Sequence, residues 1–278
     1  MASYTLMGIL NVTPDSFSDG GRFMEPQDAL EHATRLAREG AGILDVGGES
    51  TRPGAEPVSP EEELSRTVPV LGALARAQLG VELSIDTTKA VVARAAIEAG
   101  AVLVNDVSAL RADPEMAEVV ASGGVGCCLM HMLGEPRTMQ LQPRYEGDVV
   151  DEVKAFLEQR LAFAVAAGIA EERIILDPGI GFGKTLRHNL ALLDRLDELR
   201  SLGRPIMVGT SRKRFLGVLG ARAHGSPEPL EADRRLPGTL ATSVLALERG
   251  ASIFRVHEVA PVAEALAVAT ATLGGDGG

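Results

Sequence analysis

Short apolar runs alternate along the chain with longer segments in which apolar residues recur at helical spacing. The runs are mostly apolar throughout, as expected of strands that are covered on both faces of a sheet. This alternation predicts repeated βα units around a parallel sheet. Eight runs have strand length, namely 5–11, 42–47, 81–86, 101–106, 125–131, 173–178, 205–211 and 252–257.

The segments between these runs show one apolar face, which Ala29 and Ala33 share in the first of them. The segment around Ser59 carries the strongest start signal. Ser59 can cap a helix, Pro60 suits its first position and Glu62 completes a capping box. A helix is therefore predicted to begin at Pro60.

Eight strands, each followed by a helix, are the number that closes a (β/α)8 barrel of about 250 residues. We therefore expect an α/β fold, a TIM barrel that forms a single domain over residues 1–278 with a flexible C-terminal tail from about residue 274. A doubly wound open sheet gives a similar pattern and is the alternative. The stretch SRKRFLGVLG after the seventh run predicts a short extra helix.

Composition narrows the partners and the compartment. The formal net charge of -11 argues against broad contact with nucleic acid or an anionic membrane surface. The only two cysteines, Cys127 and Cys128, are adjacent, which makes no disulfide framework and favours a reducing cytoplasm. The chain has no signal-like start and no apolar stretch of about 18 residues, so we expect a soluble, untargeted protein.

Polar residues follow every one of the apolar runs. In a barrel these positions converge at the C-terminal mouth, where the active sites of this fold lie. Their convergence is more informative than any single residue among them. They are Asn11, Glu49 to Arg52, Asp86, Asn105 with Asp106, His131, Asp177, Ser211 to Lys213, and Arg255 with His257.

Several of these residues also have a purely structural interpretation. Asp86 could cap the helix that follows it, and Asp177 could form a turn before the next proline. His131 lies between two methionines and is more often a structural histidine. Met130 and Phe182 could belong to the core or wall a flat apolar ligand.

The stretch DPGIGFGKT at 177–185 resembles a nucleotide-binding P-loop. Three residues, not four, separate its first glycine from the GK pair, which excludes an ordinary P-loop. The glycines instead allow the backbone to pass close to a ligand. The sequence also lacks zinc-ligand spacing, HExxH and a GxSxG nucleophile.

Basic residues indicate a site for an anion. The segments SRKR (211–214) and RVH (255–257) leave the seventh and eighth predicted strands, the usual phosphate site of a barrel, and the first of them opens a helix. Arg52 adds a third basic side chain. The alternative is that these cations pair with neighbouring carboxylates. Several cations at one mouth favour a phosphate or pyrophosphate.

Asp86, Asn105 and Asp177 add acceptors and an amide that suit a donor-rich heterocycle such as an aminopyrimidinone. Two spaced carboxylates in a barrel could instead indicate a glycosidase. The chain has no Trp and two Tyr, and so offers little aromatic surface for stacking sugars. A heterocycle that carries a phosphate is therefore favoured.

These motifs, in this order, resemble those of the dihydropteroate synthase family over residues 5 to about 260. The matching stretches are GILNVTPDSFSDGG, GGESTRPGA, SIDTTK, NDVSAL, LMHM with GEPRTMQ, DPGIGFGKT, TSRKRFLG, and GTLATSV with RVHEV. The resemblance implies a cytoplasmic (β/α)8 homodimer, a sulfonamide target, that joins 6-hydroxymethyl-7,8-dihydropterin pyrophosphate to 4-aminobenzoate. The products are pyrophosphate and 7,8-dihydropteroate for folate biosynthesis.

The resemblance also implies residue roles, carried over by position. The pterin would be held by Asp86, Asn105, Met130, Asp177, Phe182 and Lys213. The pyrophosphate would be held by Asn11, Arg52, Arg255 and His257, with Asn11 also a ligand of Mg2+. The aminobenzoate site and its closing loops would comprise Asp15, Phe17, Thr51, Pro53 and Ser211. The catalytic set would be Asp86, Lys213, Arg255 and His257.

The implied reaction is dissociative, with pyrophosphate leaving before the amine attacks. One rival is a pterin-dependent methyltransferase domain, which we expect to lack the Asn11 loop, the ESTRPG arm and the RVH site. A non-catalytic pterin-binding paralogue is the other. The sequence departs from the family pattern at Glu258, where we expect Asp.

Overall fold

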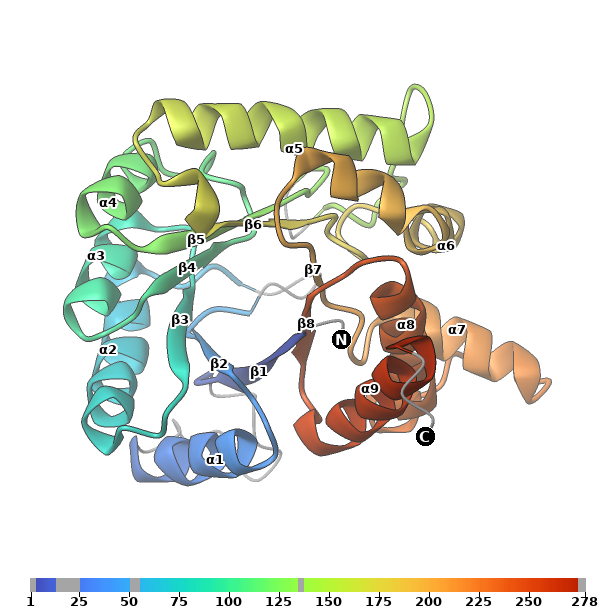
Figure 1. The fold of residues 1–278 in the computed structure, drawn as a ribbon, viewed down its shortest axis with the longest axis horizontal. Coiled ribbons are helices and arrows are strands. Elements are labelled where there is room, and N and C mark those ends of the chain that lie inside the picture. Colours follow the sequence, from blue (N-terminus) through green and yellow to red (C-terminus); the bar gives the residue numbers. More distant parts are fainter. Residues whose placement is uncertain (1–3, 14–25, 51–55, 135–137, 275–278) are drawn as a thin grey trace.

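Parallel strands form one sheet that curls into a barrel, and helices surround it (Figure 1). The structure is a computed structural model and describes residues 4–13, 26–50, 56–134 and 138–274. Within these residues the strand order is β6-β5-β4-β3-β2-β1-β8-β7. The strands are β1 (Thr5–Asn11), β2 (Ile43–Gly47), β3 (Glu82–Asp86), β4 (Leu103–Asp106), β5 (Gly126–Met130), β6 (Ile174–Asp177), β7 (Met207–Val208) and β8 (Ile253–Val256).

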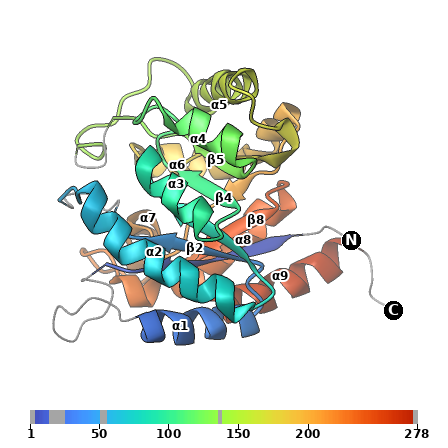
Figure 2. The same ribbon diagram turned by 90° about the vertical axis from the view of Figure 1, so that its left-hand side faces the viewer.

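Helices follow the strands in turn and form the outer layer of the barrel. They are α1 (Pro26–Arg38), α2 (Pro60–Ala77), α3 (Ala90–Glu98), α4 (Met116–Gly123), α5 (Val149–Ala166), α6 (Leu186–Asp194), α7 (Arg214–Ala223), α8 (Leu236–Glu248) and α9 (Val259–Gly274), with 3-10 turns η2 (Glu171–Arg173), η3 (Leu196–Leu202) and η4 (Ala232–Arg235). The extra helix predicted after the seventh strand is α7, which points away from the ring (Figure 1). Viewed from the side, α2 and α3 lie in front of the strands (Figure 2).

Closure of the barrel distinguishes this fold from the open-sheet alternative. β1 pairs with β2 on one side and with β8 on the other. β6 and β7 meet at a single bridge between Leu176 and Ile206, and the Leu176 N–H donates to the carbonyl of Pro205 over 3.0 Å. The predicted TIM barrel is thus confirmed. The predicted seventh strand, 205–211, shrinks to two residues.

Each predicted strand run contains a strand, and the predicted helix start at Pro60 is confirmed. The Ser59 side chain accepts a hydrogen bond from the Glu62 N–H over 3.2 Å. The predicted capping box is only half formed, because the Glu62 carboxylate contacts the Arg66 guanidinium instead of returning to the Ser59 N–H. The cap signal was local, so sequence alone was enough to find it.

A layer of apolar side chains fills the barrel below its mouth. This layer comprises Met7, Ile43, Leu103, Cys128, Met207 and Ile253. Side chains alternate along a strand, so residues two positions later face the same interior. Three of those later positions hold Asp45, Asn105 and Arg255. The barrel interior therefore changes from apolar to polar within one step toward the carboxyl ends of the strands.

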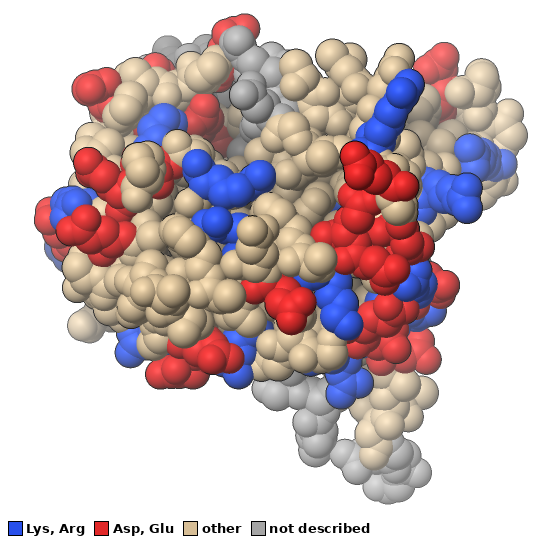
Figure 3. Space-filling view, turned by 90° about the horizontal axis from the view of Figure 1, so that it is seen from above, with Lys and Arg blue, Asp and Glu red and all other residues tan. Residues whose placement is uncertain are grey.

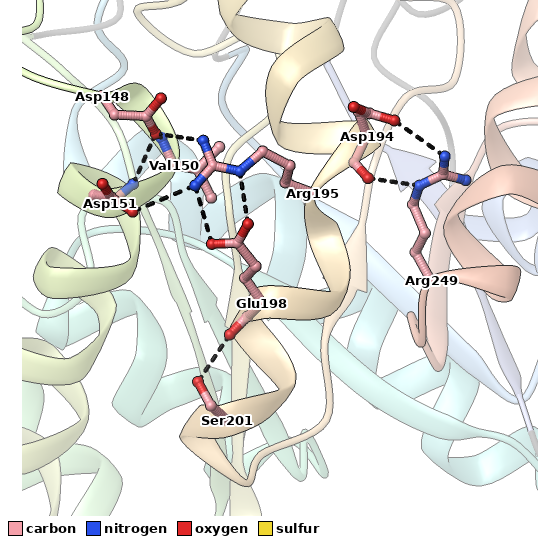
Figure 4. Close-up of polar contacts among 8 residues, drawn as sticks. All are labelled: Asp148, Val150, Asp151, Asp194, Arg195, Glu198, Ser201 and Arg249. Atoms are coloured by element: carbon pink, nitrogen blue, oxygen red, sulfur yellow. Dashed lines mark hydrogen bonds and ion pairs between the residues drawn. The ribbon is translucent and has the colours of Figure 1, made fainter.

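Exposed ion pairs join neighbouring helices of the outer layer (Figure 4). Arg195 follows α6 and contacts Glu198 over 2.6 Å and Asp148, the cap of α5, over 2.9 Å. Arg249 follows α8 and donates to the carbonyl of Asp194 over 2.7 Å and to its carboxylate over 3.1 Å. The pair of Arg249 with Asp194 thus links α8 to α6.

Charged side chains are unevenly spread over the surface. On the face drawn in Figure 3, Asp and Glu gather towards the right, and Lys and Arg stand in small separate groups. Across the part of the chain that the structure describes, every helix is too short or too polar to cross a bilayer. The expected flexible tail falls on residues 275–278, which lie outside the described residues.

Candidate active site

Four strand ends stand side by side at one edge of the barrel mouth. The strand register places Asn11, Gly47, Asp86 and Asn105 in one row across β1 to β4. A side chain added at Gly47 would bring its Cβ to 3.4 Å from Asn11 Oδ1 and 3.8 Å from Asp86 Oδ2. Gly47 thus leaves room between the two polar groups. Asn11, Asp86 and Asn105 converge at one edge of the mouth, as the sequence predicted.

Arg255 reaches this row from β8. Its Nε donates to Asp45 Oδ2 over 2.6 Å, and its Nη2 donates to Asp86 Oδ2 over 2.7 Å. The alternative interpretation of this cation, pairing with neighbouring carboxylates, therefore holds for Arg255 in this structure. The same contacts also place the guanidinium among the other polar groups of the mouth.

Asp86 does not cap the helix that follows it. α3 begins at Ala90, and the N–H of Ala90 donates to Asp113 Oδ2 over 2.8 Å. Burial raises the pKa of Asp86 to about 7, against the attraction of Arg255 and with the help of repulsion from Asp45. The carboxylate is therefore poised to titrate near neutral pH, as expected of a functional group in a cleft.

Asp177 forms a turn and also faces the mouth. Its Oδ1 accepts from the Gly179 N–H over 2.6 Å, which confirms the turn interpretation. Burial raises the pKa of Asp177, and the nearby Lys213 ammonium opposes that change. Burial in turn lowers the pKa of Lys213 to about 8. The two predicted pterin contacts thus form a mutually dependent pair.

Lys213 lies over an apolar wall. Its ammonium group contacts the Ile180 carbonyl and sits 4.5 Å from the centre of the Phe182 ring. The half-buried Phe182 packs against a buried cluster made of Val107, Met130, Met132 and Met139. Met130 and Phe182 therefore pack in one apolar cluster, next to the polar groups of the mouth.

The glycines of the DPGIGFG loop approach protein atoms closely. At Gly179, φ is +66° and an added Cβ would stand 1.8 Å from the carbonyl oxygen of His131. At Gly183 the close neighbour is the backbone of Leu133. The loop therefore packs against the exit of β5, and these two glycines allow that close contact between backbones.

His131 is a structural residue, as its local sequence favoured. Its Nδ1 lies 2.9 Å from Lys184 Nζ, and the imidazole is buried between Tyr145 and Phe156. Burial and the neighbouring Lys184 lower the pKa of His131 to about 2. The buried Lys184 also donates to the Phe182 carbonyl over 3.0 Å. This pair fixes the loop that carries Phe182.

Ser211 and His257 contact each other at the exits of β7 and β8. Ser211 Oγ lies 2.9 Å from His257 Nδ1 and accepts from the His257 N–H over 3.2 Å. Glu258 forms an ion pair with Arg212, whose Nε donates to Glu258 Oε1 over 2.6 Å. An acidic residue at this position, where the sequence departs from the pattern that it resembles, therefore forms an ion pair with Arg212.

Five of the predicted site residues cannot be placed. Asp15, Phe17, Thr51, Arg52 and Pro53 lie outside the described residues. The remaining predicted residues all lie at the same mouth.

Sequence reasoning missed Asp45. It is fully buried in the middle of β2 and accepts from Arg255, from Asn105 Nδ2 over 2.9 Å and from Ser84 Oγ over 2.6 Å. The signal was present, since a charged residue inside a wholly buried strand is rare unless it is paired. Asp45 lies inside its strand, so a comparison of strand ends alone does not include it.

The barrel and its mouth define a class of protein. The profile of the family described as pterin binding enzymes matches residues 7–257. The dihydropteroate synthase of Mycobacterium leprae is 50% identical over 277 residues, covering 98% of this chain and 95% of that protein. The chain therefore belongs to the dihydropteroate synthase family.

Two solved structures agree with this assignment. The Yersinia pestis dihydropteroate synthase, solved as a sulfonamide drug complex, superposes with a TM-score of 0.90 at 45% identity, covering 98% of this chain and 95% of that one. The Xanthomonas albilineans dihydropteroate synthase, solved with 4-aminobenzoic acid, superposes with a TM-score of 0.88 at 46% identity, covering 98% and 93%.

Proposed function

We propose that this protein joins 6-hydroxymethyl-7,8-dihydropterin pyrophosphate to 4-aminobenzoate and releases 7,8-dihydropteroate and pyrophosphate, a step of folate biosynthesis. The observation that carries the proposal is the meeting of buried acceptors, an apolar wall and Arg255 at one mouth. The buried acceptors and the apolar wall suit a heterocycle, and Arg255 suits the pyrophosphate that the heterocycle carries. The sulfonamide and 4-aminobenzoic acid bound by the two related enzymes support the same substrates.

The pterin ring lies against Met130 and Phe182. Asp86 and Asp177 accept N–H bonds from its edges, Asn105 adds an amide, and Lys213 donates to a ring acceptor. Two carboxylates that face a donor-rich ring reject analogues that lack those donors, because a buried acceptor would then be left unpaired.

Arg255 and His257 hold the pyrophosphate together with Arg52, which lies outside the described residues. Arg255 pairs with Asp86 in this structure. When the pterin takes Asp86, Nη2 of Arg255 is released toward the anion. One substrate thus occupies both partners of the ion pair.

The bond between the pterin methylene and the pyrophosphate oxygen breaks first, and the electron pair leaves with pyrophosphate. The resulting cation is delocalised into the pterin ring and is stabilised by Asp86. The nitrogen of aminobenzoate then forms the new C–N bond and loses a proton. Preorganised charges on both separating ions lower the barrier without a covalent protein intermediate.

Asn11 is the proposed ligand of Mg2+. Its amide oxygen lies at the mouth beside Asp86, and amide oxygens suit this cation. No group of three or more His, Cys, Asp or Glu that could hold a metal occurs within residues 4–13, 26–50, 56–134 and 138–274. One protein oxygen fits Mg2+ all the same, because this ion commonly takes its other ligands from water and substrate phosphates. Bound there, it would neutralise charge on the leaving pyrophosphate.

Ser211 borders the proposed aminobenzoate site, and the other residues assigned to that site lie outside the described part of the chain. Its hydroxyl is oriented by His257, to which it is hydrogen bonded. A short polar group at this rim fits a carboxylate of a small aromatic acid.

Assembly as a homodimer and a cytoplasmic location complete the proposal. Exposed apolar side chains on α8 and α9, Leu245 and Val268, support a protein contact on these neighbouring helices. The free, buried thiols of Cys127 and Cys128 support a reducing compartment. Light scattering of the purified protein tests the dimer, and a monomer that remains fully active would contradict it.

The test of the function mixes purified protein with Mg2+, dihydropterin pyrophosphate and 4-aminobenzoate. Pyrophosphate release and dihydropteroate formation are measured together, and we expect equal amounts. Tight pterin binding without product would favour the non-catalytic paralogue. Methyl transfer from a methylated pterin to a corrinoid protein would favour the methyltransferase instead.

A further inference from the structure

Asp45 is the buried centre of the polar groups under the mouth. Its side chain is fully buried and receives hydrogen bonds from three strands. Oδ2 accepts from Arg255 Nε over 2.6 Å and from Asn105 Nδ2 over 2.9 Å, and Oδ1 accepts from Ser84 Oγ over 2.6 Å. Two of the three donors belong to residues that meet the substrate under the proposed function.

We propose that Asp45 is a positioning residue for the reaction, which holds the Arg255 guanidinium in place and decides which atom of the Asn105 amide faces the pterin. The proposal rests on the proposed function. Asp45 itself lies one layer below the row formed by Asn11 and Asp86 and acts only through its neighbours.

Asp45 fixes the orientation of the Asn105 amide. An amide has two donors on nitrogen and an acceptor oxygen. Because a carboxylate can only accept, Asp45 binds Nδ2 of Asn105 and leaves Oδ1 as the group available to the substrate. A neutral or donating group at position 45 would remove this constraint on the orientation of the amide.

Asp45 and Asp86 bind different parts of the Arg255 guanidinium. Asp45 holds Nε near the base of the guanidinium, and Asp86 binds Nη2 at its tip. When substrate takes Asp86, the bond to Asp45 remains. Arg255 can then turn its tip toward the pyrophosphate while its base stays fixed. A fixed base keeps the motion small, and small displacements of charged groups cost large factors in rate.

A buried charge at position 45 is expected to add little to the stability of the barrel. Burying an ion pair seldom stabilises a protein more than well-packed apolar residues of the same volume do. The adjacent layer of this barrel, which includes Met7 and Ile43, is apolar and closes the interior without any charge. A fully buried carboxylate at position 45 is thus explained better by the groups that it orients than by stability.

The test compares Asp45→Asn with Ser84→Ala. Ser84 is equally buried and bonds the same carboxylate, yet it contacts neither the proposed pterin site nor Arg255 through any bond described above. Asp45→Asn is expected to lower kcat about tenfold to hundredfold, because Arg255 and Asn105 lose their fixed orientations. Ser84→Ala is expected to keep kcat within about threefold of wild type.

A second readout separates positioning from loss of structure. The dissociation constant of inorganic pyrophosphate, measured by calorimetry, is expected to stay within about threefold of wild type in Asp45→Asn, since the variant keeps the cation and loses a competing carboxylate. Normal kcat in Asp45→Asn would overturn the proposal. So would a parallel loss of pyrophosphate binding and thermal stability, which indicates a collapsed site.

Failure of the proposed function is distinguishable from failure of this inference. If the wild-type protein formed no dihydropteroate, the proposed function would be wrong. The role of Asp45 would then be judged by binding of 6-hydroxymethylpterin, which Asp45→Asn should weaken at least about tenfold and Ser84→Ala should not. Equal binding by both variants and wild type would overturn the positioning role.

Discussion

Arg255 and Asp86 face each other across the barrel mouth, with Nη2 of the arginine 2.7 Å from Oδ2 of the aspartate. The two side chains form an ion pair in this structure. The proposed substrate carries a donor-rich ring for Asp86 and an anion for Arg255, so it replaces both halves of this pair. Its binding therefore exchanges one set of charge contacts for another and leaves no buried charge unpaired.

Asp86→Asn should preserve the fold and abolish most turnover. The amide keeps the size of the side chain but removes the negative charge beside the pterin cation. Removing one preorganised group of this kind typically lowers kcat by about 10² to 10³. The dihydropteroate assay measures the loss, and a thermal melt confirms the fold. Asp197→Asn, at an exposed position on η3, is the matched control. Near-normal turnover in Asp86→Asn would remove this residue from the mechanism.

The pH dependence of kcat/KM for the pterin substrate should be bell-shaped. Asp86, with a pKa of about 7, must be ionised to accept from the pterin, so the rate rises as pH increases through that value. Lys213, with a pKa of about 8, must be protonated to donate, so the rate falls above it. Lys213→Arg should move the alkaline limb upward, because a guanidinium stays charged. An unmoved limb would assign it to another group.

Stability should also respond to Lys213. Burial lowers its pKa in the folded state below the value of the unfolded chain, so the unfolded state binds more protons between about pH 8 and 10.5. The free energy of unfolding therefore rises with pH in that window through this group. Urea titrations at several pH values should show the rise in wild type and a flatter curve in Lys213→Met. The same slope in both proteins would contradict the prediction.

Gly179→Ala should be far more destabilising than Gly203→Ala. Both glycines have left-handed φ, +66° and +70°, where an alanine costs about 1–2 kcal/mol. At Gly203 no atom lies within 4 Å of the added Cβ, whereas at Gly179 the His131 carbonyl is 1.8 Å away. Overpacking adds about 1–3 kcal/mol at Gly179, and the loop must move. Denaturant midpoints measure both, and equal losses would show that the loop adapts freely.

Lys89→Met should destabilise the protein by about 3 kcal/mol, because it leaves a buried charge without its partner. Lys89 Nζ lies 2.5 Å from Oε2 of Glu63, whose side chain is fully buried, and also contacts Glu49. The control is Arg35→Met, which breaks an exposed pair with Glu39 at 4.0 Å and should cost less than about 1 kcal/mol. A loss of less than about 1 kcal/mol for Lys89→Met would contradict the prediction.

The strands were predictable because each is a short apolar run covered on both sides. Their bounds differ from the predicted runs by few residues, except at β7, where Gly209 and Thr210 follow the two strand residues. The run 205–211 reads as continuous. Only the pairing partners decide how much of it joins the sheet, and partners are a tertiary property that a local pattern does not contain.

The site was predictable as a set of strand ends, and less so in its contacts. Asp86 was a candidate cap by spacing, yet Asp113 supplies that bond from the loop before α4. The distance in sequence between Asp113 and Ala90 hides the contact. Asp45 was not predicted as a site residue, because it lies inside a strand. Its burial and its bonds to other strands become visible only in the folded barrel.

The pairing between β6 and β7 is the weakest strand contact of the described barrel. One bridge and a two-residue strand hold the sheet there, while Arg249 and Asp194 link the covering helices. Asp177 ends β6, and Lys213 follows β7 on the other side of this weak contact. A ligand that bonds to both residues would join β6 to β7, and we therefore expect it to slow amide exchange at Leu176.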